Sequence, residues 1–121
     1  MPSTLGHIFQ QAQTQLPAPH AGLALIDTGA SITAVEESVL QGLGLSATSA
    51  IQIEVPGGSA RRPLYDCDIT LPGTPIPTLP FNSVVGMGLA RLGFSALIGR
   101  DLLRRFQLVY NGAEGFWTLA F

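Results

Sequence analysis

The sequence predicts an all-β domain, and three of its features carry that prediction. Fourteen Gly and nine Pro among 121 residues supply frequent turns. Short apolar runs separate these turns, and some of them show the two-residue period of a half-buried strand. Helical spacing is confined to brief segments. At this length the chain forms one domain with a modest core, and its apolar share of 46% is typical of a folded protein.

Residues 1–20 stand apart from the β pattern. Four apolar residues between positions 5 and 12 have helical spacing, but the surrounding glutamines make a mobile arm an equally good interpretation. Pro17 and Pro19 end any helix there. We therefore divide the chain into an unassigned N-terminal arm or helix, residues 1–20, and a domain that spans residues 21–121.

The first part of the domain combines a strand with a short helix. Residues 23–26 form a continuous apolar run between Gly22 and Asp27, which is typical of a buried strand. A short helix or helical turn is expected over residues 36–45, where two early glutamates favour the helix dipole and two glycines mark its end.

A glycine-rich hairpin follows. Ile51, Ile53 and Val55 alternate with polar residues, which predicts a half-buried strand. Residues 56–59, Pro-Gly-Gly-Ser, are a strong turn signal, and residues 64–71 return as the second strand.

The next segment is broken up by four prolines between positions 72 and 80. It can hold only short or edge strands, of which residues 81–85 are one candidate, and residues 86–93 are expected to be a loop. A second apolar run over residues 95–98 ends at Gly99.

The C-terminal part is expected to hold one short helix and a closing hairpin. The helix spans residues 101–106, with an aspartate in its first turn. Two apolar strands, residues 108–110 and 116–121, flank a five-residue loop over residues 111–115.

Charge and cysteine content exclude several classes of function. Charged residues make up 12% of the chain, against about 25% in ordinary globular domains, and the net charge of −2 comes without a basic stripe. This argues against nucleic-acid binding. No stretch approaches the roughly 18 apolar residues of a membrane span, and residues 1–10 lack a signal-peptide pattern. The single Cys67 forms neither an internal disulfide nor a zinc site, so we expect a cytoplasmic protein without a metal or cofactor.

The segment Ala24 to Ser31, Ala-Leu-Ile-Asp-Thr-Gly-Ala-Ser, holds the first chemical motif. An Asp-Thr-Gly triplet alone indicates no more than a local turn. Here it directly follows a buried apolar run and precedes small residues, so that the Asp27 carboxylate ends a core strand. That placement makes Asp27 the candidate catalytic residue.

A second motif, residues 96–103, reads Ala-Leu-Ile-Gly-Arg-Asp-Leu-Leu. Together the two blocks resemble those of the retropepsins, the retroviral-type aspartic proteases and their cellular and bacterial relatives. That family has an apolar-apolar-Asp-Thr-Gly-Ala block, then an apolar-apolar-Gly-Arg-Asp/Asn block, with a flap hairpin between them. The resemblance covers about residues 23–121. It implies a retropepsin-like acid-protease fold with one short C-terminal helix and a flap hairpin.

The resemblance also implies a mechanism. One chain contributes one aspartate, so a C2 homodimer supplies the second as the symmetry copy of Asp27. Two carboxylates about 3 Å apart cannot both ionise and share one proton, as aspartic proteases do. The ionised carboxylate then activates a water for attack on a peptide or protein substrate, without a metal or cofactor.

The same resemblance gives roles to the residues after Asp27. Thr28 would hydrogen-bond across the dimer axis and support the active-site loop. Gly29 would also support the loop and let the substrate backbone approach closely, since it has no Cβ. Ala30 and Ser31 would line the substrate cleft.

Further site residues come from the flap and from the second motif. Gly57 and Gly58 at the hairpin tip would close over the substrate, and Leu97 would face a side-chain pocket. Arg100 would brace the active-site loop. Ser31 stands where several viral members have an acidic partner for this arginine, so either Asp101 or a backbone carbonyl is expected to replace it.

Two other interpretations remain open. The chain could be a catalytically idle retropepsin-like module that dimerises or binds peptide, or an unrelated β-rich ligand-binding domain. The intact Asp-Thr-Gly favours the enzyme, an aspartic endopeptidase. The apolar closing hairpin, residues 108–121, is the expected dimer interface because its unpaired edges invite association.

Overall fold

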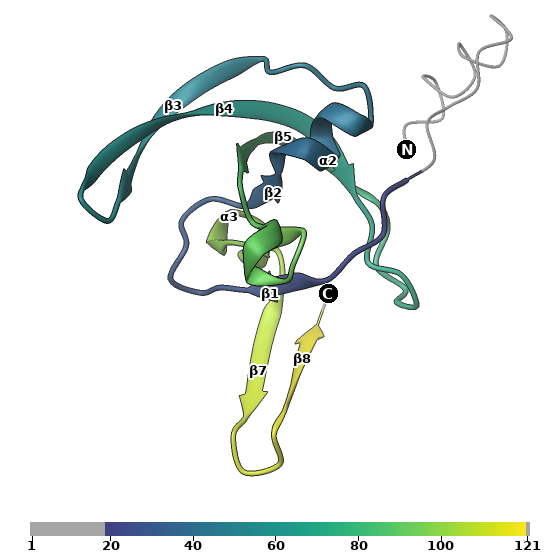
Figure 1. Cartoon of the computed structure of the whole chain (residues 1–121). Helices are drawn as coiled ribbons and strands as arrows, with labels where there is room; N and C mark the ends of the chain where they lie inside the picture. The colour runs from purple at the N-terminus through teal and green to yellow at the C-terminus, as the bar shows by residue number, and fades with distance from the viewer. Residues whose placement is uncertain (1–18, 121) are drawn as a thin grey trace, which may run out of the picture.

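The computed structural model describes residues 19–120, which are built mostly of β-strands with a few short helices (Figure 1). Within these residues one six-stranded sheet has the order β1-β6-β2-β5-β4-β3, and β7 and β8 form a separate hairpin. The strands are β1 Ala24–Ile26, β2 Ala34–Glu36, β3 Ser49–Val55, β4 Gly58–Ile69, β5 Leu79–Met87, β6 Ala96–Ile98, β7 Gln107–Asn111 and β8 Phe116–Ala120. The helices are α2 Glu37–Gly42, the 3-10 turn η1 Ala90–Leu92 and α3 Arg100–Leu103.

This β-rich architecture agrees with the all-β prediction, with several corrections of detail. The second strand of the glycine-rich hairpin begins at Gly58 rather than at residue 64, because it pairs with β3 up to the turn. The expected strand over 81–85 extends to 79–87 and takes in the start of the expected loop. Helix α2 confirms the short helix expected over residues 36–45, although the predicted fold counted only the C-terminal helix. Residues 1–18 of the arm or helix expected over residues 1–20 lie outside the described residues.

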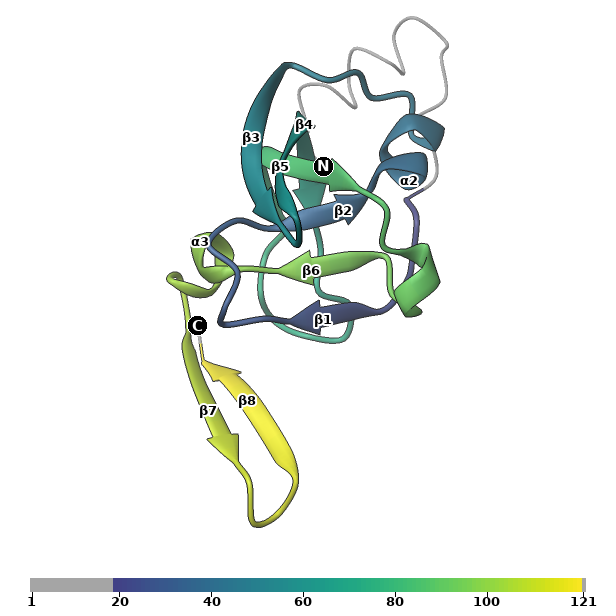
Figure 2. The same ribbon diagram turned by 60° about the vertical axis from the view of Figure 1, so that its left-hand side comes forward.

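The two motif blocks come together at one side of the sheet. β1, expected to be a buried strand, is an edge strand there and is mostly exposed, because β6 alone pairs with it. β6 pairs with β1 in parallel, with Ala24 opposite Ala96 and Ile26 opposite Ile98, and it pairs with β2 in antiparallel (Figure 2). Since parallel strands end at the same edge of a sheet, the residues after Ile26 and after Ile98 are neighbours. Asp27 and Gly99 therefore meet, although the sequence separates them widely.

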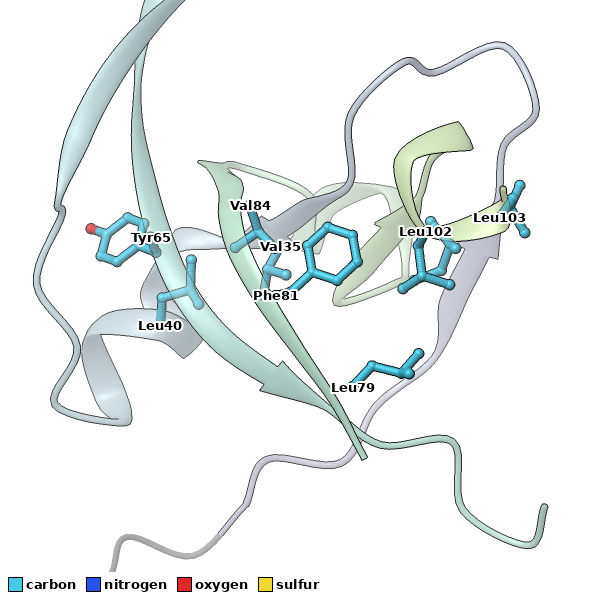
Figure 3. Close-up of a cluster of buried hydrophobic side chains, with 9 residues drawn as sticks. Val35, Leu40, Tyr65, Leu79, Phe81, Val84, Leu102 and Leu103 are labelled. Atoms are coloured by element: carbon cyan, nitrogen blue, oxygen red, sulfur yellow. The ribbon is translucent and has the colours of Figure 1, made fainter. Parts of the chain in front are cut away.

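Two apolar clusters lie on opposite faces of this sheet, because successive strand residues alternate in direction. Val35 and Val84 belong to the main core, whereas their neighbours Ala34 and Val85 belong to a smaller cluster. Figure 3 shows the main core, in which side chains from the sheet meet those of α2 and α3. Its buried members are Val35, Leu40, Tyr65, Leu79, Phe81, Val84, Ile98, Leu102 and Leu103.

The smaller cluster is only partly covered. Ala34, Val85 and Leu89 are buried at its centre. Half-buried side chains surround them, namely Ile32, Ile51, Leu64, Met87, Phe94 and Leu97. We call this set the floor cluster, because six of its members line the groove described below, namely Ile32, Ala34, Ile51, Val85, Met87 and Leu97.

The β7-β8 hairpin extends away from the six-stranded sheet (Figures 1 and 2). Near its base, Leu119 packs against the main core. Farther along, four large apolar side chains are open to solvent: Val109 49%, Tyr110 72%, Phe116 52% and Trp117 50% exposed. A single chain therefore leaves the expected interface hairpin uncovered.

No helix within residues 19–120 is long and apolar enough to cross a membrane. The same residues hold no group of three or more His, Cys, Asp or Glu side chains placed to bind a metal ion.

Candidate active site

Asp27 sits where β1 ends and the loop to β2 begins. Its backbone N–H donates to the carbonyl of Ile98 at 2.9 Å, which anchors the loop to the end of β6. The Gly29 N–H donates to Asp27 Oδ1 at 2.9 Å, and the Ala30 N–H donates to the Asp27 carbonyl at 3.2 Å. The loop thus folds back on the half-buried Asp27 and fixes one carboxylate oxygen.

Gly29 has a steric reason to lack a side chain. A Cβ at this position would lie 3.2 Å from Asp27 Oδ1, closer than most such contacts. The expected role of Gly29 in substrate approach stays a prediction, but its N–H has a direct contact with the candidate catalytic group.

The second motif crosses this loop and binds it at two points. The backbone N–H of Arg100 donates to the Ala30 carbonyl at 2.8 Å, and its Nη1 donates to the Thr28 carbonyl at 2.9 Å. Of the two partners expected in place of an acidic residue, the guanidinium therefore has the backbone carbonyl. Figure 2 shows the loop between β1 and β2 running beside the start of α3.

Asp101 has a different partner, which sequence reasoning missed. Its carboxylate accepts the Thr33 N–H at 3.0 Å and the Thr33 hydroxyl at 2.7 Å. The same hydroxyl oxygen accepts the Gly99 N–H at 3.1 Å, and Thr33 is fully buried. These bonds join the second motif block to Thr33, two residues beyond the first block, and Asp101 was their one signal in the sequence.

A groove with a volume of about 800 Å³ opens next to this loop. One wall is formed by Gly29, Ala30 and Ser31, and the floor cluster contributes Leu97 and other apolar side chains. The opposite wall is β3, through residues 51–54. Four of the residues predicted to bind substrate therefore line one groove.

The remaining predicted residues lie beside the groove rather than along it. Asp27, Thr28 and Arg100 are not among the described residues that line it. Gly57 and Gly58 form the tip of the β3-β4 hairpin, with φ angles of 90° and 144°, and a Cβ on either would meet no atom within 4 Å. The tip is therefore open to solvent in the single chain.

A β-bulge shapes one end of the groove. The pairing of β4 with β5 shifts between Tyr65 and Cys67, where Ser83 adopts a φ of 76°. Its N–H donates to Asp66 Oδ1 at 3.0 Å, and Asn82 and Ser83 line the groove. Bulges often redirect side chains next to binding sites, which is the effect here.

Cys67 is not suited to act as a nucleophile. Burial, followed by the charges of Asp68 and Asp66, raises the pKa of its thiol to about 11. A reactive cysteine needs a lowered pKa, because the thiolate is the attacking species. The carboxylate of Asp27 is the better candidate for chemistry at this site.

Comparisons with protein-family models, with curated proteins and with solved structures gave no match. The functional assignment therefore depends on the motifs and geometry of this chain.

Proposed function

We propose that this chain is one half of a homodimeric aspartic endopeptidase of the retropepsin type, with Asp27 as its catalytic carboxylate. The observation that carries the proposal is the contact between the two motif blocks. Arg100 binds the Asp27 loop through its main chain, at Ala30, and through its side chain, at Thr28, which lies 72 positions earlier. The two motifs thus meet at the loop that carries the Asp27 carboxylate, and this loop lies beside a groove.

The chemistry requires a second copy of Asp27. A twofold axis beside the exposed Thr28 would set two such loops face to face. The two carboxylates would share one proton and titrate as a pair. The ionised carboxylate takes a proton from a water, which attacks the peptide carbonyl carbon, and the protonated one donates to the carbonyl oxygen. A proton then passes to the leaving amine as the C–N bond breaks.

An extended peptide is the substrate that the groove suits. β3 is one of the two edge strands of the six-stranded sheet, and its residues 51–54 line the groove. A peptide can therefore add to this edge through main-chain hydrogen bonds while its apolar side chains rest on the floor cluster. The hairpin tip at Gly57 and Gly58 would close over the bound segment and exclude water.

The exposed hairpin supports association of two chains. An isolated two-stranded hairpin is only marginally stable in water. The β7-β8 hairpin also has exposed apolar side chains and unpaired edges. Pairing with the same hairpin of a second copy would cover both and complete the cleft.

Asp27→Asn tests the proposal. The amide keeps the shape of the carboxylate but cannot act as a base, so cleavage of a peptide library should fall by ~10²–10⁴-fold or more while the fold is retained. Asp68→Asn, which removes an exposed carboxylate on β4, is the matched control and should keep its activity. Cleavage by Asp27→Asn at the wild-type rate would refute the assignment, and a wild-type chain that binds peptides without cutting them would favour the idle module.

A further inference from the structure

Glu36 holds both ends of the segment that follows β5. In the sheet it lies opposite Met87, the last residue of β5. Its Oε1 accepts the backbone N–H of Leu89 at 2.6 Å and that of Ala90 at 2.7 Å. Its own backbone N–H donates to the carbonyl of Ser95 at 2.8 Å. One residue thus closes the segment 88–95 into a loop, which we call the wall loop.

The wall loop does not line the groove itself, but it packs against Ala34 and Val85, which do. Leu89 is one of the three buried members of the floor cluster, and Phe94 packs against them. Between them, the loop turns through η1 and Gly93, whose φ of 89° ends that turn, and Leu92 is 66% exposed. Because so little of the loop is buried, its position depends on the bonds at its two ends.

The second carboxylate oxygen of Glu36 is also engaged. Oε2 accepts the hydroxyl of Ser38 at 2.9 Å and its N–H at 3.3 Å, which caps the start of α2. The bonds to Leu89, Ala90 and Ser38 lower the pKa of Glu36 from 4.5 to about 2. The carboxylate therefore stays ionised in the acid range where a shared-proton dyad can work.

We propose that Glu36 is a positioning residue for substrate selection: by holding Leu89 and Ala90 it fixes the wall loop, and with it the apolar floor that receives a substrate side chain. Glu36 does not touch the groove itself, since it is absent from the described residues that line it. The proposal rests on the protease function proposed above, but the hydrogen bonds that it invokes can be tested without activity.

Glu36→Ala removes the side-chain bonds and keeps the backbone bond to Ser95. Hydrogen exchange at the Leu89 and Ala90 amides should accelerate by roughly tenfold or more, with the Leu103 amide of α3 as an internal reference. In the cleavage assay KM should rise by roughly tenfold, whereas kcat should change less than about twofold, since Asp27 is untouched. Preference for Leu or Phe over Ala beside the cut bond should also weaken.

Two variants separate this role from a general loss of stability. Glu36→Gln keeps one oxygen for the two amides and should recover part of the KM and of the amide protection. Glu37→Gln makes the same charge change one residue along, but it alters the acceptor of the Tyr65 hydroxyl instead, so Leu89 and Ala90 should exchange as in wild type.

The outcomes distinguish the two proposals. An inactive wild type with fast Leu89 and Ala90 exchange in Glu36→Ala would refute the protease while keeping the role of Glu36 in the loop. An active enzyme in which Glu36→Ala keeps wild-type exchange and the wild-type cleavage preference would overturn the inference about Glu36. Equal losses in Glu36→Ala and Glu37→Gln would also overturn it, because they would indicate destabilisation alone.

Discussion

At the scale of single residues, Gly99 is packed so closely against the loop after β1 that a side chain does not fit there. A Cβ there would lie 2.7 Å from the carbonyl carbon of Ile32, 2.8 Å from its oxygen and 3.1 Å from the carbonyl oxygen of Ala30. These are backbone atoms, which cannot turn aside as a flexible side chain can. The active-site loop itself would have to move.

Gly99→Ala should therefore destabilise the fold by at least the ~1–3 kcal/mol of an overpacked core and lower activity further by displacing Asp27. Gly42→Ala is the control: a Cβ there meets nothing within 4 Å, and Ala favours the end of α2. Chemical denaturation and a cleavage assay on both variants test this. Equal stability of Gly99→Ala and wild type would show that Gly99 is not tightly packed against the backbone of Ile32 and Ala30.

Glu36 gives stability a defined pH dependence. Its pKa of about 2 in the folded chain lies below the usual 4.5, so the unfolded chain binds more protons between these values. This contribution is fully present above about pH 4.5 and is lost as the pH falls through 2. Glu36→Gln should flatten the rise of unfolding free energy with pH in that window, measured by urea denaturation at several pH values. Parallel curves for wild type and variant would contradict the assigned hydrogen bonds.

At the scale of elements, the local sequence pattern predicted several strands and one turn. The apolar runs that end at Asp27 and Gly99 became β1 and β6, and the alternation from Ile51 to Val55 became β3. The Pro-Gly turn also lies where it was expected, with Gly57 at a positive φ.

The pairing of strands that are far apart in the chain could not be predicted from the sequence, for a physical reason. β2 has three residues, and only its pairing with β5 and β6, far away in the chain, makes it a strand. β5 carries Pro80 near its start and so resembles a broken segment. The bond between Thr33 and Asp101 spans 68 positions, and no local periodicity signals such a contact.

The β7-β8 hairpin gives a prediction at the same scale. Tyr110 and Trp117 are cross-strand partners and both are exposed in one chain. Central aromatic residues of an interface are worth about 2 kcal/mol or more each, and both chains of a homodimer would carry the substitutions. Tyr110→Ser with Trp117→Ser should therefore raise the dimer dissociation constant by at least about three orders of magnitude. Analytical ultracentrifugation measures it.

Leu92→Ser is the control for that variant, since Leu92 is an exposed apolar residue on η1, outside the hairpin. It should dimerise like wild type. If the hairpin variant also dimerised like wild type, another surface would have to form the interface.

At the scale of the whole molecule, the proposed cleft is formed by two chains together. Residues 19–120 hold one Asp-Thr-Gly loop, and the groove beside it has one wall from the loop and one from β3. In the proposed dimer each chain contributes one carboxylate of the pair, so a single chain should be inactive.

Mixing wild type with Asp27→Asn tests this claim most directly. Chains are combined in varying ratios at constant total concentration, allowed to exchange, and assayed for peptide cleavage, with sedimentation velocity confirming that dimers persist. If both aspartates are needed, mixed dimers are inactive, and activity falls with the square of the wild-type fraction. Activity that falls in simple proportion to the wild-type fraction would show that each chain cuts independently, which would contradict the shared pair.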